Sequence, residues 1–151
     1  MNVQIIEEKK IYGLVTRTKN ADEMNENTGK IGLLWKKFDE KVDVNYKEGE
    51  RVYGIYSNYE SDANGEFDVF AGYDSFNKDL ELRSIEKGRY LVFTKSFTQT
   101  DDHTRVQAII ATWGKVWEYF SNEKSEYKRA YKTDFEWYKG LNEIEICISI
   151  K

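Results

Sequence analysis

Glu136 is the residue whose type and surroundings most directly suggest chemistry. It lies between Phe135 and Trp137 in a stretch, residues 134–138, that alternates in the manner of a β-strand. A carboxylate enclosed by apolar side chains is costly unless a positive group pairs with it. Glu136 therefore either faces water, with Phe135 and Trp137 on the buried side, or waits in a buried site for a cation. The alternation alone leaves both interpretations open.

Aromatic side chains make up 15% of the residues, which is enough to line a binding site. Aromatic faces attract cations and stack on flat ligands. The candidates are Trp35, Trp113 and Trp117 in segments with helical spacing, and Tyr56 and Tyr73 in strand-like segments. Each also has a simpler interpretation, because tryptophans on an apolar helix face pack on a sheet and strand tyrosines pack against neighbouring strands.

Other reactive residue types carry weaker signals. Glu145 alternates with isoleucines and could simply be the solvent side of its strand, and Cys147 reads as a small buried apolar residue. His103, the one histidine, stands beside two aspartates at a predicted helix start, where a solvated turn is the better interpretation. Metal-ligand spacing and glycine-rich phosphate loops are absent from the sequence, so we expect no metal, no cofactor and no assigned catalytic residue.

Composition bounds the class of protein. We expect 151 residues to form one domain, residues 1–151. A net charge of −4 without a basic tail argues against direct nucleic-acid binding. No apolar run approaches the length of a membrane span, and the N-terminus lacks a signal-peptide core, so we expect a cytoplasmic protein with no membrane partner. A single cysteine excludes an internal disulfide.

Hydrophobic spacing predicts the elements that must position these residues. An extended strand, residues 3–18 with a bulge or bend at Gly13, precedes a helix with Asn20 as its N-cap and Glu23 completing a capping box. Further strands are predicted at 52–59, 67–73, 89–97, 134–138 and 144–150, and a second helix begins at the cap formed by residues 100–102. Its apolar face carries Val106, Ile109, Ile110, Trp113, Val116, Trp117 and Phe120.

The order strand, helix, strand, strand occurs twice, over about residues 1–75 and 85–151. The prediction is an α+β fold in which duplicated strand-helix-strand-strand units form a twisted antiparallel sheet with two helices on its concave face. A cleft between the helices, near a pseudo-twofold axis, is then a natural ligand position.

An ordered set of short motifs resembles the GyrI-like, or AraC-type, effector-binding domain family over the whole chain. The motifs are residues 32–38, 52–56, 70–73, 88–90, 117–120, 134–138 and 145–150. The resemblance implies two units around a central cavity that binds small, often cationic hydrophobic molecules. It places the central acid at Glu136 and a second acid at Glu145.

The same resemblance assigns helix tryptophans to Trp35 and Trp117 and strand aromatics to Tyr56 and Tyr73. Family members commonly end in Glu-Ile-Tyr-Ile-Pro, whereas this chain has Cys147 and Ser149 in place of the Tyr and the Pro. We expect the loss of that tyrosine to open or reshape one wall of the cavity. The chain looks like a stand-alone member, because it begins almost directly with the first strand.

The sequence favours a binding protein over an enzyme. A buried Glu136 would have a raised pKa that a bound cation lowers again, so the ligand would supply the counter-charge. The alternative is a hydrolase of electrophilic aromatic compounds, with Glu136 as general base and Tyr56 or Tyr138 polarising a carbonyl. The resemblance also permits regulation of a topoisomerase by protein contact. A homodimer is a further partner that the sequence leaves open.

Overall fold

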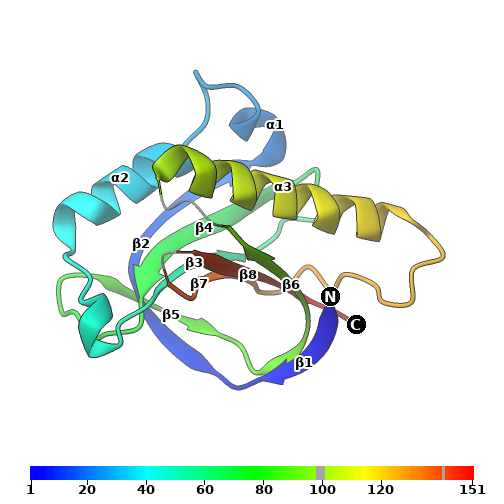
Figure 1. The fold of residues 1–151 in the computed structure, drawn as a ribbon. Coiled ribbons are helices and arrows are strands. Elements are labelled where there is room, and N and C mark those ends of the chain that lie inside the picture. The colour runs from blue at the N-terminus through cyan, green and yellow to red at the C-terminus, as the bar shows by residue number, and fades with distance from the viewer. Residues whose placement is uncertain (98–100, 141) are drawn as a thin grey trace.

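The structure is a computed structural model that describes residues 1–97, 101–140 and 142–151. Within these residues, eight strands form one sheet, and three α-helices and a short 3-10 helix complete the fold (Figure 1). The elements in chain order are β1 (Asn2–Ile6), β2 (Lys9–Lys19), α1 (Asn20–Glu23), α2 (Ile31–Lys41), the 3-10 helix (Tyr46–Glu48), β3 (Val52–Ser57), β4 (Glu66–Tyr73), β5 (Glu81–Ile85), β6 (Gly88–Ser96), α3 (Asp102–Ser121), β7 (Asp134–Tyr138) and β8 (Glu143–Ser149).

The strand order is β1-β6-β8-β7-β3-β4-β2-β5, and every neighbouring pair is antiparallel. From the central β7·β3 pair, the strands run β3, β4, β2 to one side and β7, β8, β6 to the other. The two edge strands are exchanged, because β5 pairs with β2 and β1 pairs with β6. The predicted α+β fold, with two helices on the concave face of a twisted antiparallel sheet, is confirmed.

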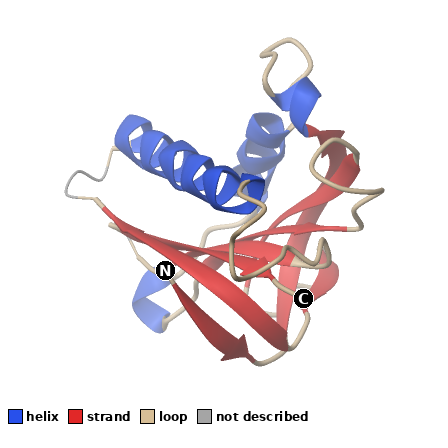
Figure 2. Ribbon diagram, turned by 90° about the vertical axis from the view of Figure 1, so that its right-hand side faces the viewer, coloured by secondary structure: helices blue, strands red, loops and turns tan. Residues whose placement is uncertain are grey.

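Both long helices lie on the same face of the sheet (Figures 1 and 2). Leu34 and Phe38 of α2 pack on β3 and β4, and Val116 of α3 packs on the isoleucines of β8. A separate core on the opposite face contains Tyr53 and Phe135. Because side chains alternate along a strand, this placement turns Glu136 toward the helices.

The first predicted strand differs from the structure in two respects. Residues 3–18 form not one strand but two, separated at residues 7 and 8. In the strand order, β1 is at one edge of the sheet and β2 is next to the other edge. Gly13 is not a bulge either, since it keeps regular register opposite Gly72. A Cβ at Gly13 would lie 2.0 Å from the Ala71 carbonyl oxygen, so the close approach of β4 requires a glycine there.

The first helix also differs from its prediction, because α1 ends after one turn and α2 begins afresh at Ile31. Asn20 is not an N-cap: its side-chain amide donates to the Ala63 carbonyl, 2.9 Å away. Glu23 instead caps α2, accepting hydrogen bonds from the backbone N–H groups of Lys30 and Ile31 at 2.9 and 3.1 Å. The negative charge of this carboxylate also interacts favourably with the positive end of the helix dipole at the N-terminus of α2.

The start of the second helix agrees with its prediction where the structure describes it. Asp101 is the N-cap of α3, and its carboxylate accepts a 2.9 Å hydrogen bond from the Thr104 backbone N–H. Thr100, predicted in the same cap, lies outside the described residues. Among the helices within the described residues, none combines the length and hydropathy that crossing a bilayer would require.

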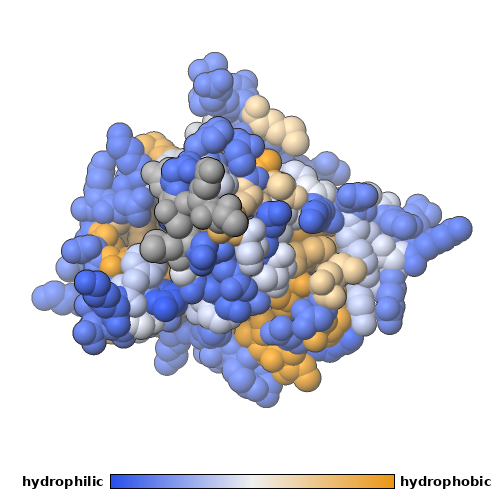
Figure 3. All heavy atoms as spheres, viewed as in Figure 1, coloured by the Kyte–Doolittle hydropathy of each residue, from blue (hydrophilic) through white to orange (hydrophobic). Residues whose placement is uncertain are grey.

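Figure 3 shows polar atoms over most of the face seen in Figure 1, with an apolar area low in the view, over β1. Ile5 of this edge strand is 71% exposed. Edge strands present unpaired backbone groups to other chains, so β1 is where the predicted homodimer contact would be sought. Dimer formation stays a prediction.

Candidate functional site

A cavity of about 930 Å³ lies between α2, α3 and the sheet. Its volume lies within the range of sites for drug-sized ligands. The sheet contributes Val52, Tyr56, Phe67, Glu136 and Tyr138, α2 contributes Ile31, Trp35, Lys36, Asp39 and Glu40, and α3 contributes Arg105, Val106, Ile109, Ile110, Trp113 and Trp117. Six of the eight predicted site residues therefore meet in one cavity: Trp35, Tyr56, Trp113, Trp117, Glu136 and Tyr138.

Glu136 is only 2% exposed and is held by three hydrogen bonds. Its Oε2 atom accepts from the Tyr56 hydroxyl at 2.8 Å and from the Trp113 indole N–H at 2.7 Å. Its Oε1 atom accepts from the Tyr138 hydroxyl at 2.8 Å. All three donors are neutral, and the salt bridges among the described residues do not include Glu136. The carboxylate is therefore solvated by hydrogen bonds without being neutralised.

Burial raises the pKa of Glu136, and the hydrogen bonds from Trp113, Tyr138 and Tyr56 oppose that rise. The pKa values of Tyr56 and Tyr138 lie well above 10, chiefly because both are buried and then because Glu136 is close. Both hydroxyls therefore keep their protons and remain donors to the carboxylate.

Gly54 provides the room for this carboxylate. It pairs with Glu136 across β3 and β7. A Cβ at Gly54 would lie 2.8 Å from Glu136 Oε1 and 3.2 Å from Trp35 Cζ2. Any larger residue at this position would displace either the carboxylate or the indole.

Aromatic rings in edge-to-face contact surround the carboxylate. The Trp35 and Tyr138 ring centroids lie 5.7 Å apart, and those of Tyr56 and Trp113 lie 5.1 Å apart. Trp117 continues this wall, 6.2 Å from Trp113, and is 42% exposed. The indole and phenol groups thus do two things here: some donate to Glu136, and the remaining faces line the cavity.

The predicted apolar face of α3 divides into two parts. Val116 is fully buried on the sheet. Val106 and Ile110 line the cavity and are 48% and 56% exposed, respectively. The helix thus carries more apolar surface than its packing uses, and the surplus opens on the cavity.

The structure does not bring Tyr73 and Glu145 to this cavity. Tyr73 packs under α2 with its ring centroid 5.9 Å from that of Phe38. Glu145 belongs to the opposite face of the sheet, where its carboxylate pairs with Lys139 at 3.3 Å. Neither side chain lines the cavity, so we leave both out of the proposed site.

The expectation that Cys147 reshapes a cavity wall is wrong. Cys147 is fully buried in the core on the face away from the helices, beside Phe135 and Tyr53. Burial raises the pKa of its thiol. A larger side chain at this position would press on that core and not on the cavity.

Sequence reasoning missed one pair of charged residues at the site. Arg129 lines the cavity and pairs with Asp134, with 2.9 Å between Nη2 and Oδ2. Asp134 shares the alternation of Glu136, so its orientation follows from the same strand pattern. Arg129 follows a charged loop and carries no periodic signal that could have identified it.

The chain matches known proteins over nearly its whole length. A family model described as Cass2, an integron-associated effector binding protein, matches residues 4–150. The integron cassette protein VCH_CASS2, from the mobile metagenome of Vibrio cholerae, is 38% identical and has a TM-score of 0.85, covering 99% of this chain and 95% of that one. YobU, a putative transcriptional regulator protein of Bacillus subtilis strain 168, is 26% identical over 138 residues, or 86% of this chain and 81% of YobU.

Two more distant structures share the fold. A putative transcription regulation protein from Staphylococcus aureus MU50 has a TM-score of 0.69 at 13% identity, covering 99% of this chain and 97% of that one. SAV2435, solved with bound tetraphenylphosphonium, has a TM-score of 0.64 at 12% identity, covering 99% and 93%. At such identities the likeness concerns the fold alone. The predicted effector-binding resemblance is confirmed by the family match: this chain belongs to Cass2, the family of integron-associated effector binding proteins.

Proposed function

We propose that the cavity binds small hydrophobic cations and that Glu136 is their counter-charge. The observation that carries the proposal is a carboxylate 2% exposed, bonded to three neutral donors and, among the described residues, outside every salt bridge. Taking a charge out of water is costly unless it is compensated. A bound cation would supply that compensation and so bind more tightly than a neutral molecule of the same shape.

The walls support the same class of ligand. Each aromatic face that meets a cation contributes about 0.5–2 kcal/mol, depending on how much water is excluded. Trp35, Trp117 and the apolar residues of α3 add buried area for flat or branched hydrocarbon groups. Because one charge and several rings make few directional demands, we expect tolerance of many shapes. Tetraphenylphosphonium, the molecule bound to the similarly folded SAV2435, is such a hydrophobic cation.

Within this proposal the protein acts as an effector sensor or as a sequestering module. A hydrolase would need a lone pair of Glu136 directed at water, whereas three hydrogen bonds already use about three of the four acceptor sites of this carboxylate. This supports binding over catalysis. Control of a topoisomerase by protein contact stays a prediction.

Charge selectivity can be tested with two ions of nearly equal shape and opposite sign. Tetraphenylphosphonium and tetraphenylborate are titrated while tryptophan fluorescence is recorded, since three of the four tryptophans line the cavity. We expect saturable quenching by the phosphonium and much weaker binding of the borate. Equal affinity for both ions would overturn the proposal, because burial of apolar area alone would then explain binding.

A further inference from the structure

The helix-facing side of β7 carries a second buried carboxylate. Asp134 lies two residues before Glu136 and is fully buried. Residues two apart on a strand point to the same face, with their Cα atoms about 7 Å apart. The floor beneath the helices thus contains two acids on neighbouring positions, of which the proposed function uses one.

The chain neutralises Asp134 with its own cation. Arg129 Nη2 lies 2.9 Å from Asp134 Oδ2, and the Tyr59 hydroxyl donates to the same oxygen at 2.5 Å. The Ser149 backbone N–H donates to Oδ1 at 2.8 Å. The Arg129 guanidinium also lies over the rings of Tyr59 and Tyr131, at 5.5 and 4.6 Å from their centroids. A carboxylate, a cation and aromatic faces are therefore assembled here within the protein.

This is the same set of interactions that the proposed function assigns to Glu136 and its ligand. The difference is that Arg129 supplies the positive charge at Asp134, whereas a ligand supplies it at Glu136. Arg129 and Tyr59 both line the cavity, so this built-in pair borders the space that the ligand would enter.

The buried charges set how much positive charge the cavity can take. Two of the charged residues that line the cavity are buried, Arg129 at 9% exposed and Glu136 at 2% exposed. The other charged lining residues are half-buried or exposed, so water and salt screen their charges better. With Asp134 included and Glu136 ionised, the buried groups sum to one negative charge. Without the guanidinium they would sum to two.

We propose that Arg129 is a specificity-determining residue: by occupying a would-be second cation subsite at Asp134, it restricts the cavity to ligands with a single positive charge. This inference rests on the proposed function and narrows it from hydrophobic cations to hydrophobic monocations. A dication would have to place its second charge beside Arg129, where the two positive charges repel.

A matched pair of ligands tests the inference. Benzyltrimethylammonium and p-xylylenebis(trimethylammonium) share a ring and an ammonium group and differ by one charge. Their dissociation constants are measured by fluorescence titration for the wild type and for Arg129→Gln. We expect Arg129→Gln to shift the ratio of the two constants toward the dication by roughly tenfold, the lower end of the range for one charge-assisted contact. An unchanged ratio in a folded variant would overturn the inference.

Two further variants keep the test decisive if Arg129→Gln does not fold, which circular dichroism would reveal. Asp134→Asn leaves the Arg129 charge unneutralised at the cavity wall, where it repels a bound cation. The affinity of this variant for benzyltrimethylammonium should therefore fall by roughly tenfold. Unchanged affinity of folded Asp134→Asn would contradict the inference. The double variant, with Arg129→Gln and Asp134→Asn, again has a buried charge of minus one. Its ratio of dissociation constants for the monocation and the dication should equal that of the wild type. A ratio that differs from the wild type would also contradict the inference.

These outcomes separate the two proposals. If the wild type binds neither ammonium ion nor tetraphenylphosphonium, the proposed function itself fails. If the wild type binds monocations and loses them on Glu136→Gln, while Arg129→Gln keeps the wild-type ratio, only the role of Arg129 fails.

Discussion

Glu136 and Asp134 show how two carboxylates on one strand acquire different roles. Both are buried on the same face of β7. Asp134 has a guanidinium partner at 2.9 Å, whereas Glu136 has only neutral donors. A buried charge that lacks an ionic partner carries an uncompensated desolvation cost, which a bound cation would reduce. The proposed function therefore depends on the lack of an ionic partner for Glu136 within the protein, and not on an unusual type of residue.

The ionisation of Glu136 predicts how binding depends on pH. Its pKa is raised by burial, and a bound cation favours the ionised form. Affinity for tetraphenylphosphonium should therefore be constant above the raised pKa and fall as the pH drops through it, in a window above the usual range for glutamate. Titrations over a pH series test this, because the ligand itself does not titrate. Glu136→Gln should show a flat profile; a wild type with an equally flat profile would contradict the prediction.

Gly54 gives a second prediction at the residue scale. The Cβ of Gly54→Ala would lie 2.8 Å from Glu136 Oε1, so the carboxylate or Trp35 must move. We expect weaker cation binding and a loss of about 1–3 kcal/mol in the free energy of unfolding. Fluorescence titration and urea denaturation measure the two effects.

Gly114→Ala is the matched control for this substitution. Gly114 lies in α3, and a Cβ added there would meet nothing within 4 Å, so this change should add about 0.5–1 kcal/mol of stability through helix propensity. Cation affinity of Gly54→Ala equal to that of Gly114→Ala would show that Gly54 does not provide room for the site.

Much of the site could be predicted from residue types, and its missing parts have physical reasons. The strand pattern left the direction of Glu136 open, and the structure resolves it because Phe135 and Trp137 pack on the opposite face. Glu145 lies on that opposite face because it pairs with Trp137 across β7 and β8. Arg129 could not be found, because an ion pair between a loop and a strand leaves no period in the sequence.

At the scale of elements, the link between α1 and α2 positions the cavity wall that carries Trp35. Glu23 holds the start of α2 through the backbone N–H groups of Lys30 and Ile31, and its Oε2 also accepts from the Thr18 hydroxyl at 2.5 Å. One side chain thus joins β2, α1 and the first turn of α2. Sequence reasoning placed Glu23 in a capping box at the start of one continuous helix after Asn20, whereas the structure has two helices and Glu23 caps the second. A cap that reaches across a loop has no local pattern.

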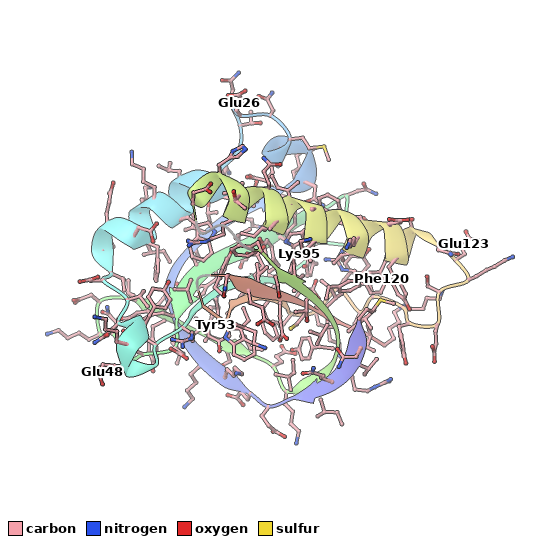
Figure 4. All side chains as sticks on the ribbon, viewed as in Figure 1. Glu26, Glu48, Tyr53, Lys95, Phe120 and Glu123 are labelled. Atoms are coloured by element: carbon pink, nitrogen blue, oxygen red, sulfur yellow. The ribbon has the colours of Figure 1, made fainter. Side chains whose placement is uncertain are left out.

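Glu23→Ala should lower the free energy of unfolding by about 1–2 kcal/mol, since it removes a helix cap and leaves the Thr18 hydroxyl without this acceptor. Chemical denaturation measures the effect. Glu26→Ala is the control, because Glu26 is exposed and projects from the top of the molecule in Figure 4. If both variants lost the same stability, the change of charge in this loop, and not the cap, would be responsible.

Regular elements were predictable where they had a period, and edge elements were not. The strands β3, β4, β6, β7 and β8 and the apolar face of α3 follow from spacing. The division of residues 3–18 into β1 and β2 did not, because both segments are rich in strand-forming residues and differ only in their partners, β6 and β4. The strand β5, exposed over most of its length, was missed because its mixed residues show no clear alternation.

At the scale of the molecule, the two halves are interlaced. Edge strand β1 pairs with β6 of the second half, and β5, which directly precedes the second half, pairs with β2 of the first. We propose on this basis that residues 1–151 form a single domain in which about 1–75 and 85–151 are structural repeats. Neither half could then complete its sheet alone.

Interlacing predicts that the whole chain unfolds in one transition. Tryptophan fluorescence reports chiefly the cavity, because three of the four tryptophans line it. The reactivity of Cys147 toward a thiol reagent reports the core on the opposite face, where Cys147 is fully buried. The two urea transitions should share one midpoint, with Cys147 unreactive before it. Separate midpoints would mean that the halves, or the two faces, unfold independently.

The most direct test of the account is the affinity of Glu136→Gln for tetraphenylphosphonium. Gln keeps the shape of the side chain and removes only its charge, and the Tyr138 hydroxyl can turn to accept from the new amide. We predict a dissociation constant higher by about tenfold to a hundredfold, the equivalent of one charge-assisted contact. Glu145→Gln, an acid on the other face of the sheet, should leave the affinity unchanged. A Glu136→Gln variant that binds the cation as tightly as the wild type would contradict the central claim.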